Sequence, residues 1–568
     1  MQNDKGSVMR DNTGVRMANA LENVAYSMCS IKNHVTNEDT KSVRDEYAPG
    51  VLFIDYDGTE IDFIAAEEVA SLQYLPPNPT HEGLISQGWN WSLEDIQDYI
   101  SKYPEAVLTV GQMYATESGA TEITLDVRER LTVPLVFQQS VSEGVTVDWG
   151  DGGDPATFEG TGVINTTHTY PEEGEYVITL SAAEGCEIDF GDGDQLNVLG
   201  GSFSKHHHTH CAFVRKISIG QNVPQIGDHA FDGCANFTTL TIPKSVTLIG
   251  AYSFSMCNSF VSLTLPCNVA QISNNAFDSC FSYKYLSIPN KVEEIGESAF
   301  CNCYNVAHVA IPEKITSIAK SSFGYCYNLK TLSISNNVEN IGVTGFYQCF
   351  SLQNLILPKN LITINNTAFS RCQKLLSIDI PEKVTTIGSS AFAYCYNVKS
   401  ITIPESVTYI GKNAFQYCRS LCDLTIPKNI TYIEPYVFYD CISLKSLKLP
   451  DNLIELGAYA FTNCRNLKNL QSPDTLTSIG STCFSDGFSL TALTIPNNVT
   501  SIGSFAFSSC FNLYSLVFES TTPPVIDASS FTNLPSDCTI YVPAGCGETY
   551  RTATNWARYA DRIVEMEP

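Results

Sequence analysis

Residues 298–320 read "SAFCNCYNVAHVAIPEKITSIAK", and residues 390–412 read "SAFAYCYNVKSITIPESVTYIGK". The phenylalanine of the "AF" pair, here called the marker Phe, recurs every 23 residues in thirteen copies without a slip. Self-similarity at a fixed period of this kind is the signature of a solenoid. The repeat therefore predicts the architecture of most of the C-terminal two-thirds of the chain. The markers are Phe231, Phe254, Phe277, Phe300, Phe323, Phe346, Phe369, Phe392, Phe415, Phe438, Phe461, Phe484 and Phe507.

The consensus of the repeat is A-F-x-x-C-x-x-L-x-x-L-x-I-P-x-x-V-x-x-I-G. In "LxxLxI" the apolar residues two apart point inward from a short strand, and their neighbours point outward. The Pro that follows lacks a donor and ends the strand, and the Gly after the second Ile is free to turn. Because stacked strands lie about 4.8 Å apart, thirteen coils extend over roughly 60 Å.

This frame resembles the BspA-like leucine-rich repeats, from about residue 205 to the C-terminus. The resemblance implies a mostly β chain with a 23-residue solenoid of about 13–14 coils over residues 205–519. In the run "HHHTHC" (206–211), the repeat frame places a degenerate first coil that caps the solenoid. Residues 520–568 resemble the terminal strand and amphipathic helix of the family. The apolar side of that C-terminal cap is expected to hold Trp556, Tyr559 and Ile563.

Residues 119–204 contain "VTVDWGDGGDPATF" and "THTYPEEGEYVITL", which are similar to PKD-type (Ig-like) β-sandwich modules. The resemblance places Trp149-Gly150-Asp151-Gly152 at a turn and His168-x-Tyr170 before a strand. In that strand Tyr176, Ile178 and Leu180 share one face. The aspartates could bind Ca²⁺, but no twelve-residue loop with a terminal bidentate Glu is present. Turn chemistry is the favoured interpretation.

Residues 49–118 are expected to form a small α+β domain that serves for attachment. A helix should begin at Ser92, with Asp95 as its capping-box partner, and the tandem Trp89 and Trp91 should pack its core. The stretch "VLFIDYDGTE" (51–60) resembles the nucleophile loop of haloacid-dehalogenase-type phosphotransferases.

A second interpretation of that stretch is a strand, an Asp-Gly turn and a strand. A phosphotransferase of that class needs alternating strands and helices over some two hundred residues, and only about sixty residues follow before the PKD-like module. The chain also has no Ser-His-Asp or HExxH arrangement. We therefore predict a hairpin here, no enzymatic activity and no cofactor.

The formal net charge of −27 is unevenly distributed. Residues 1–200 hold 35 Asp and Glu against 9 Lys and Arg, whereas residues 201–568 hold 25 against 24. Neither part shows a basic stripe in the linear count, which argues against nucleic-acid binding and against docking on an anionic membrane. The sequence contains no apolar run of about 18 residues, so no membrane-spanning segment is predicted. No export signal is evident either. Residues 1–48 read as a polar arm that orders on a partner.

Twelve of the 21 Cys lie three residues after a marker Phe. A metal ladder or a disulfide framework is disfavoured, because zinc sites need ligand pairs at short spacing and parallel Cβ vectors suit disulfides badly. We expect buried thiols that fill a tight corner, in a chain that folds in a reducing compartment. In the histidine run, a structural cap is favoured over a metal site at His206, His208 and His210.

The outward strand positions, eight and ten residues after the marker, are almost uncharged and rich in hydroxyls along the row from Thr239 to Thr402. Aromatic residues cluster beside the Cys column of the middle coils. Hydroxyls and rings together suit a glycan, although Ser, Thr and Tyr also have high β-propensity. The candidate ligand-binding residues are Tyr304, Tyr325, Tyr327, Phe350, Tyr394, Tyr396 and Tyr417.

The order of the domains resembles that of leucine-rich repeat proteins of gut bacteriophages and prophages. That resemblance implies a virion component, of the tail or head-fibre kind, that recognises a host-surface glycan or protein. The acidic N-terminal region would then bind other virion proteins, and a homo-oligomer is compatible with the sequence. The alternatives are a structural decoration of the virion and a bacterial cell-surface adhesin.

Overall fold

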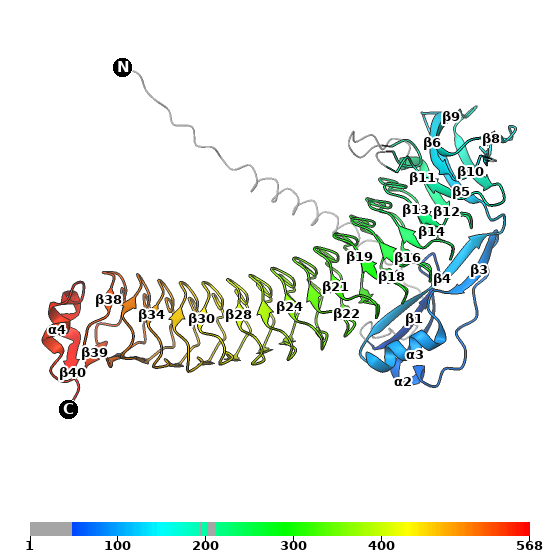
Figure 1. Cartoon of the computed structure of the whole chain (residues 1–568). Coiled ribbons are helices and arrows are strands. Elements are labelled where there is room, and N and C mark those ends of the chain that lie inside the picture. The colour runs from blue at the N-terminus through cyan, green and yellow to red at the C-terminus, as the bar shows by residue number, and fades with distance from the viewer. Residues whose placement is uncertain (1–47, 143, 194–195, 202–210, 568) are drawn as a thin grey trace, which may run out of the picture. The chain divides into compact units, whose positions relative to one another are not determined.

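The computed structural model describes residues 48–142, 144–193, 196–201 and 211–567. The expected coils are present, as a solenoid of about 15 coils of about 23 residues that follow one another in register (Figure 1). Most coils carry two short strands, and most of these strands pair in parallel with their equivalents in the next coil. The repeat therefore builds two rows of strands.

The first row contains the "LxL" strands, which begin eight residues after the marker Phe in the regular coils. It has no strand at residues 353–357. The row consists of β12 (Val214–Ser218), β14 (Thr239–Thr241), β16 (Ser262–Thr264), β18 (Tyr285–Ser287), β20 (His308–Ala310), β22 (Thr331–Ser333), β25 (Ser377–Asp379), β27 (Ser400–Thr402), β29 (Asp423–Thr425), β31 (Ser446–Lys448), β33 (Asn469–Gln471), β35 (Ala492–Ile495), β37 (Ser515–Phe518) and β39 (Thr539–Val542).

The second row contains two-residue strands that precede the Gly of the repeat. They are β13 (Gln225–Ile226), β15 (Leu248–Ile249), β17 (Gln271–Ile272), β19 (Glu294–Ile295), β21 (Ser317–Ile318), β23 (Asn340–Ile341), β24 (Thr363–Ile364), β26 (Thr386–Ile387), β28 (Tyr409–Ile410), β30 (Tyr432–Ile433), β32 (Glu455–Leu456), β34 (Ser478–Ile479), β36 (Ser501–Ile502) and β38 (Val525–Ile526).

The marker residues form a continuous ladder inside the solenoid. Phe392 stacks on Phe369 at 5.4 Å between ring centroids and on Phe415 at 5.7 Å, and all three are fully buried. Beside this ladder, the thiol of Cys395 donates to the carbonyl oxygen of Phe369 in the preceding coil, at 3.4 Å. The predicted burial of the Cys column is confirmed, and the small side chain is also a weak donor that satisfies a corner carbonyl.

The role predicted for the Gly of the repeat is wrong. Gly250 and Gly388 have no positive φ; instead, a Cβ on Gly250 would lie 2.5 Å from the carbonyl carbon of Gly227 in the preceding coil. The Gly therefore allows close approach of two backbones rather than a turn. The left-handed residues lie two positions before and two after the marker Phe, as at Ser390 and Tyr394.

The α+β domain is a four-stranded sheet in the order β2-β1-β4-β3. Its elements are β1 (Gly50–Ile54), β2 (Glu60–Ala65), α2 (Ala66–Val69), β3 (Leu84–Trp89), α3 (Leu93–Lys102) and β4 (Val107–Thr116). The predicted hairpin is confirmed, because β1 and β2 pair antiparallel around Gly58, at φ 89°. The predicted helix start is confirmed too, since Ser92 Oγ accepts from the Asp95 amide, and Trp89 and Trp91 are buried.

A β-sandwich follows, with β5, β10, β7 and β8 in one sheet and β11, β6 and β9 in the other. Strand β5 pairs antiparallel with β12, so the first of these sheets continues into the first row of the solenoid. This pairing covers the N-terminal edge of the solenoid, a cap that the sequence did not reveal. The strands are β5 (Thr121–Val127), β6 (Thr132–Gln139), β7 (Val145–Asp148), β8 (Ala156–Phe158), β9 (Gly162–Thr169), β10 (Gly174–Ala182) and β11 (Ile188–Phe190).

The C-terminal end closes with α4 (Gly547–Thr552), η3 (Ala557–Arg562) and β40 (Ile563–Glu565). Trp556, Tyr559 and Ile563 are buried, as expected of a cap. Ile563, however, opens a strand that pairs with β39 rather than extending a helix. The cap therefore ends the first row with a strand of its own. Among the described residues, none of the helices has the length and apolar character that crossing a bilayer needs.

Candidate functional site

The first row of strands divides into a covered half and an open half. From β14 to β22 most of the outward side chains are buried or half-buried, with Ser287 and His308 at 0% and 3% exposure. From β25 onward the equivalent side chains, such as Ser377, Thr402 and Asp423, are exposed. The outward row expected from the sequence is therefore a surface only in its second half.

The α+β domain covers the first half. Strand β1 has two buried faces: Val51 and Phe53 pack with α3, whereas Leu52 and Ile54 pack against Tyr285 of the solenoid. Its continuous apolar sequence matches a strand buried on both sides. The sheet thus lies between its own helix and the coils.

Polar contacts fix this docking. The Asn90 amide donates to Ser287 Oγ and to the carbonyl oxygen of Leu265, both at 2.8 Å. The Trp91 indole N–H donates to the carbonyl oxygen of Ile288 at 3.0 Å, and Tyr99 OH donates to Ser333 Oγ at 3.1 Å. Ser287 and Ser333, two of the hydroxyls that suggested a ligand surface in these coils, instead bind the protein's own domain.

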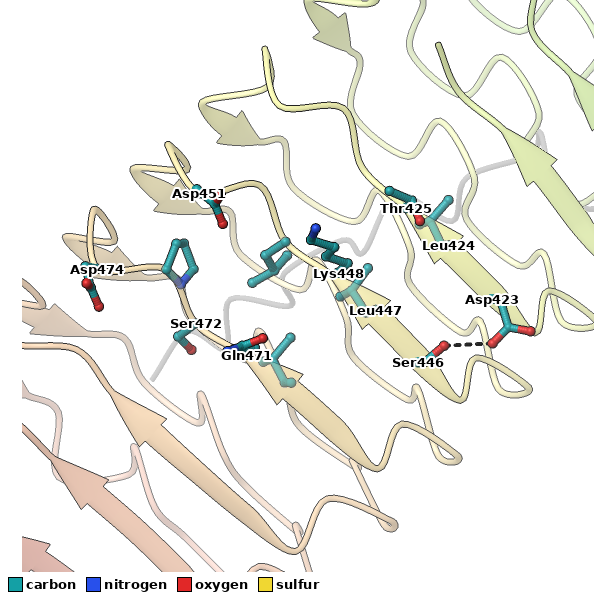
Figure 2. A pocket seen from close by; sticks show the side chains of 13 residues that line it. Asp423, Leu424, Thr425, Ser446, Leu447, Lys448, Asp451, Gln471, Ser472 and Asp474 are labelled. Atoms are coloured by element: carbon teal, nitrogen blue, oxygen red, sulfur yellow. Dashed lines mark hydrogen bonds between the residues drawn. The ribbon is translucent and has the colours of Figure 1, made fainter. Parts of the chain in front are cut away.

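The open half contains a groove of about 720 Å³, shown in Figure 2. Its floor is formed by the inward leucines of three successive coils, and its rim by polar side chains from β29, β31, β33 and the turns that follow them. The lining residues are Asp423, Leu424, Thr425, Ser446, Leu447, Lys448, Leu449, Asp451, Leu470, Gln471, Ser472, Pro473 and Asp474.

The groove offers carboxylates, one ammonium, hydroxyls and an amide. Ser446 Oγ donates to Asp423 Oδ1 at 2.7 Å, and two coils earlier, outside the groove, Thr402 Oγ1 donates to Asp379 Oδ1 at 2.8 Å. These bonds orient the carboxylates and leave the second oxygen of each for a ligand. Such a mixture of donors and acceptors is suited to the hydroxyl groups of a sugar.

The sequence prediction missed these groove residues. A signal was present: the outward strand positions are uncharged in the covered coils but include Asp379, Asp423 and Lys448 in the open ones. Charged residues are almost never buried without partners. Their first appearance at Asp379 marks where the cover has ended.

The seven aromatic residues predicted to bind a ligand lie on one edge of the solenoid, in two groups. Tyr304, Tyr327 and Phe350 stack face to face at 4.6 and 4.9 Å, and Tyr325 lies edge-on to Tyr327 at 6.3 Å. In the second group Tyr394 stacks on Tyr417 at 4.7 Å and lies 6.2 Å from Tyr396. Within each stack the facing ring surfaces are used by neighbours, so edges and hydroxyls remain for a ligand.

The loop that resembled a phosphotransferase site is a structured turn. Asp55 is 2% exposed; its carboxylate accepts from Tyr114 OH at 2.9 Å and lies 2.7 Å from His81 Nε2. Asp57 accepts from the Thr59 amide, as turn aspartates do. Both oxygens of Asp55 are thus engaged within the domain. The absence of enzymatic activity stays a prediction.

The acidic turn of the β-sandwich is also occupied by internal partners. Asp151 accepts from the Gly153 amide and lies 2.7 Å from His168 Nε2, and these contacts lower the pKa of Asp151. His168 in turn stacks on Trp149 at 4.7 Å. This geometry is that of a turn that holds two strands together.

The histidine run 206–210 and the arm 1–47 lie outside the described residues, so their predicted roles stay predictions. Over the described ranges no three His, Cys, Asp or Glu side chains come together as a metal site.

A family model described as "BspA type Leucine rich repeat region (6 copies)" matches residues 202–330, 293–422 and 408–536. No curated protein matches the chain.

Several solved structures are similar. A leucine-rich repeat protein from Bacteroides ovatus has 24% identity and a TM-score of 0.49, over 63% of this chain and 85% of that one. A leucine rich cell surface protein from Faecalibacterium prausnitzii has 22% identity and a TM-score of 0.29, over 60% and 86%. The pneumococcal vaccine antigen PcpA has 17% identity and a TM-score of 0.36, over 57% and 84%.

Proposed function

Since the chain belongs to the family of BspA-type leucine-rich repeat proteins, we propose that it is a non-enzymatic recognition protein. Its solenoid binds a ligand on a host-cell surface, and the open half of the first strand row is the binding face. One observation carries this proposal. The same strand row is buried beneath the α+β domain in its first half and is exposed, with charged residues and a groove, in its second half.

The chemistry of the groove favours a glycan. Asp423, Lys448 and Gln471 supply an acceptor, a charged donor and an amide within one groove, above a floor of leucine side chains. A sugar presents hydroxyls that need both donors and acceptors, and apolar C–H surfaces that suit such a floor. The regular spacing of the coils extends this pattern over several sugar lengths.

The triple variant Asp423→Ala/Lys448→Ala/Gln471→Ala tests the site. Binding of the purified chain to host cells should fall at least tenfold, because hydrogen bonds to charged groups contribute about 1.5–3 kcal/mol each. The matched control is Glu382→Ala/Lys383→Ala/Asn497→Ala, which removes one acid, one base and one amide outside the groove lining. Equal binding by both variants would remove the groove from the proposal.

The predicted aromatic site provides a second comparison. If the variant Tyr327→Ala/Tyr394→Ala/Tyr396→Ala loses host attachment while the groove variant keeps it, the ligand binds the aromatic edge instead.

We propose that the protein is displayed on a virion, with its N-terminal region bound to other particle proteins. Mass spectrometry of purified particles should then detect the chain, and deletion of residues 1–48 should release it. Its detection only on bacterial envelopes would favour a cell-surface adhesin.

A further inference from the structure

The positive charges of the middle coils gather on one edge of the solenoid. In the seven coils with markers Phe323 to Phe461, the seven residues that follow each marker carry eight Lys and Arg in all and one carboxylate, Asp440. The remainder of the same coils carries nine Asp and Glu against five Lys. The near-neutral total for this half of the chain therefore hides a basic edge and an acidic remainder. We name the first the basic edge; its exposed members are Lys374, Lys399, Arg419, Lys445, Arg465 and Lys468.

The backbone places these residues in columns. The backbone amide of Lys468 donates to the carbonyl oxygen of Lys445. The Lys445 amide donates to the carbonyl oxygen of Cys422, and the Cys422 amide donates to that of Lys399. Each step is one coil, so three lysines lie in one column within four coils. The Lys374 amide donates to the carbonyl oxygen of Phe350, which puts this lysine beside the aromatic groups.

Arginines interleave with the aromatic residues of the same edge. The Arg371 guanidinium lies over the Tyr394 ring at 4.7 Å, and Arg419 lies over Tyr396 at 5.4 Å and Tyr417 at 5.3 Å. Stacking of this kind holds a guanidinium in a fixed orientation and leaves N–H groups for an anion. The predicted aromatic residues thus support a row of cations.

Internal carboxylates compensate little of this charge. Arg419 is paired with Asp440 at 2.6 Å. Over the described ranges, no Asp or Glu lies within 4.0 Å of the ammonium groups of Lys374, Lys399, Lys445 and Lys468. Burial and the nearby Lys374 charge lower the pKa of Lys330, so two like charges face one another on this edge.

We propose that the basic edge binds an anionic polysaccharide, with carboxylate or sulfate groups, as a second recognition surface separate from the groove. Lysines and arginines supply donors for the acid groups, and the tyrosine hydroxyls supply donors for sugar hydroxyls. Single-stranded nucleic acid fits less well, because base stacking needs free ring faces and these stacked rings use theirs on one another.

The test uses the full chain and four polymers: heparin, polygalacturonate, uncharged dextran and poly(dT), titrated in about 50 mM salt. The edge variant is Lys399→Gln/Lys445→Gln/Lys468→Gln. The control Lys383→Gln/Lys412→Gln/Lys428→Gln removes three lysines of the same part of the solenoid that lie off the edge. Heparin or polygalacturonate affinity should fall at least tenfold in the edge variant and less than twofold in the control, and dextran should not bind.

Equal losses in the two lysine variants would show diffuse electrostatics and overturn the proposal, as would no binding of either acidic polysaccharide by the full chain. Poly(dT) binding tenfold tighter than both would assign the edge to nucleic acid. The groove variant should keep its polysaccharide affinity. Host attachment of the groove variant is measured separately, so a failure of the groove proposal and a failure of the basic-edge proposal are distinguishable.

Discussion

Each regular coil places non-glycine residues in the left-handed region at two positions around the marker Phe. The first position holds Asn275 at φ 55°, Thr367 at φ 56° and Asn413 at φ 61°. Asn tolerates this conformation, whereas a β-branched side chain is strained there by roughly 1–2 kcal/mol. The repeat thus stores local strain in some coils and relieves it in others.

Replacing Thr367 with Asn should raise the free energy of unfolding by about 1 kcal/mol, because the folded backbone is unchanged and the strain is smaller. Urea unfolding followed by circular dichroism measures the difference. The control Thr385→Asn lies seven residues before the next marker, Phe392, and its φ is not positive. It should give no gain in the free energy of unfolding. A loss of stability in Thr367→Asn would show that its hydroxyl, which donates to the Asn366 carbonyl oxygen, matters more than its backbone.

At the scale of elements, the contact between β4 and the first strand row decides which part of the solenoid is a surface. A Cβ on Gly111 of β4 would overlap the side chain of Thr264 in β16. Close approach of the two backbones therefore depends on the glycine here. Asn90, directly after the neighbouring strand β3, then reaches Ser287 and Leu265.

Gly111→Ala should loosen the α+β domain from the coils and destabilise the protein by about 2 kcal/mol or more, through overpacking of a buried contact. Limited proteolysis should cleave between residues 118 and 121 faster than in the unaltered chain. Combining Thr264→Gly with Gly111→Ala restores the space between β4 and β16 and should restore resistance to proteolysis. If the single variant is as resistant as the unaltered protein, the docking does not depend on this approach.

At the scale of the whole molecule, the buried Cys column couples stability to pH. Burial raises the pKa of the Cys418 and Cys510 thiols in this column to about 12. The folded chain therefore keeps thiol protons that the unfolded chain releases above about pH 8.5. Since the folded pKa is raised, this stability is complete below about pH 8.5 and is lost as the pH rises toward 12.

With a reductant present, thiol ionisation should leave the melting temperature unchanged from pH 7 to 8. It should then fall steeply by pH 10, where a fully buried thiol such as Cys418 costs about 2 kcal/mol. The variant Cys418→Ala/Cys441→Ala/Cys464→Ala should be less stable at pH 7 but show a shallower alkaline fall. Parallel curves for the two chains would show that other groups govern the alkaline loss.

The repeat also shows how far sequence reasoning reaches. The marker ladder, the Cys column, the inward leucines and the cap residue Trp556 follow from a pattern in which each coil contacts only its neighbours. Hairpin β1–β2 and the start of α3 are equally local, set by Asp-Gly turn chemistry and by Ser92 as the N-cap. Interactions between residues close in sequence, or one period apart, leave a readable signature.

Two features could not be read this way. The cover over the first strand row joins Asn90 to Ser287, 197 residues apart, so the sequence shows it only indirectly, in the change from uncharged to charged outward positions at Asp379. The basic edge is invisible in a linear count, because opposite charges alternate along each coil and separate only when the coils stack in register. The sequence by itself determined the coil and its C-terminal cap. Only the tertiary structure decided which face is open and where the charge collects, because both depend on which distant segments share a surface.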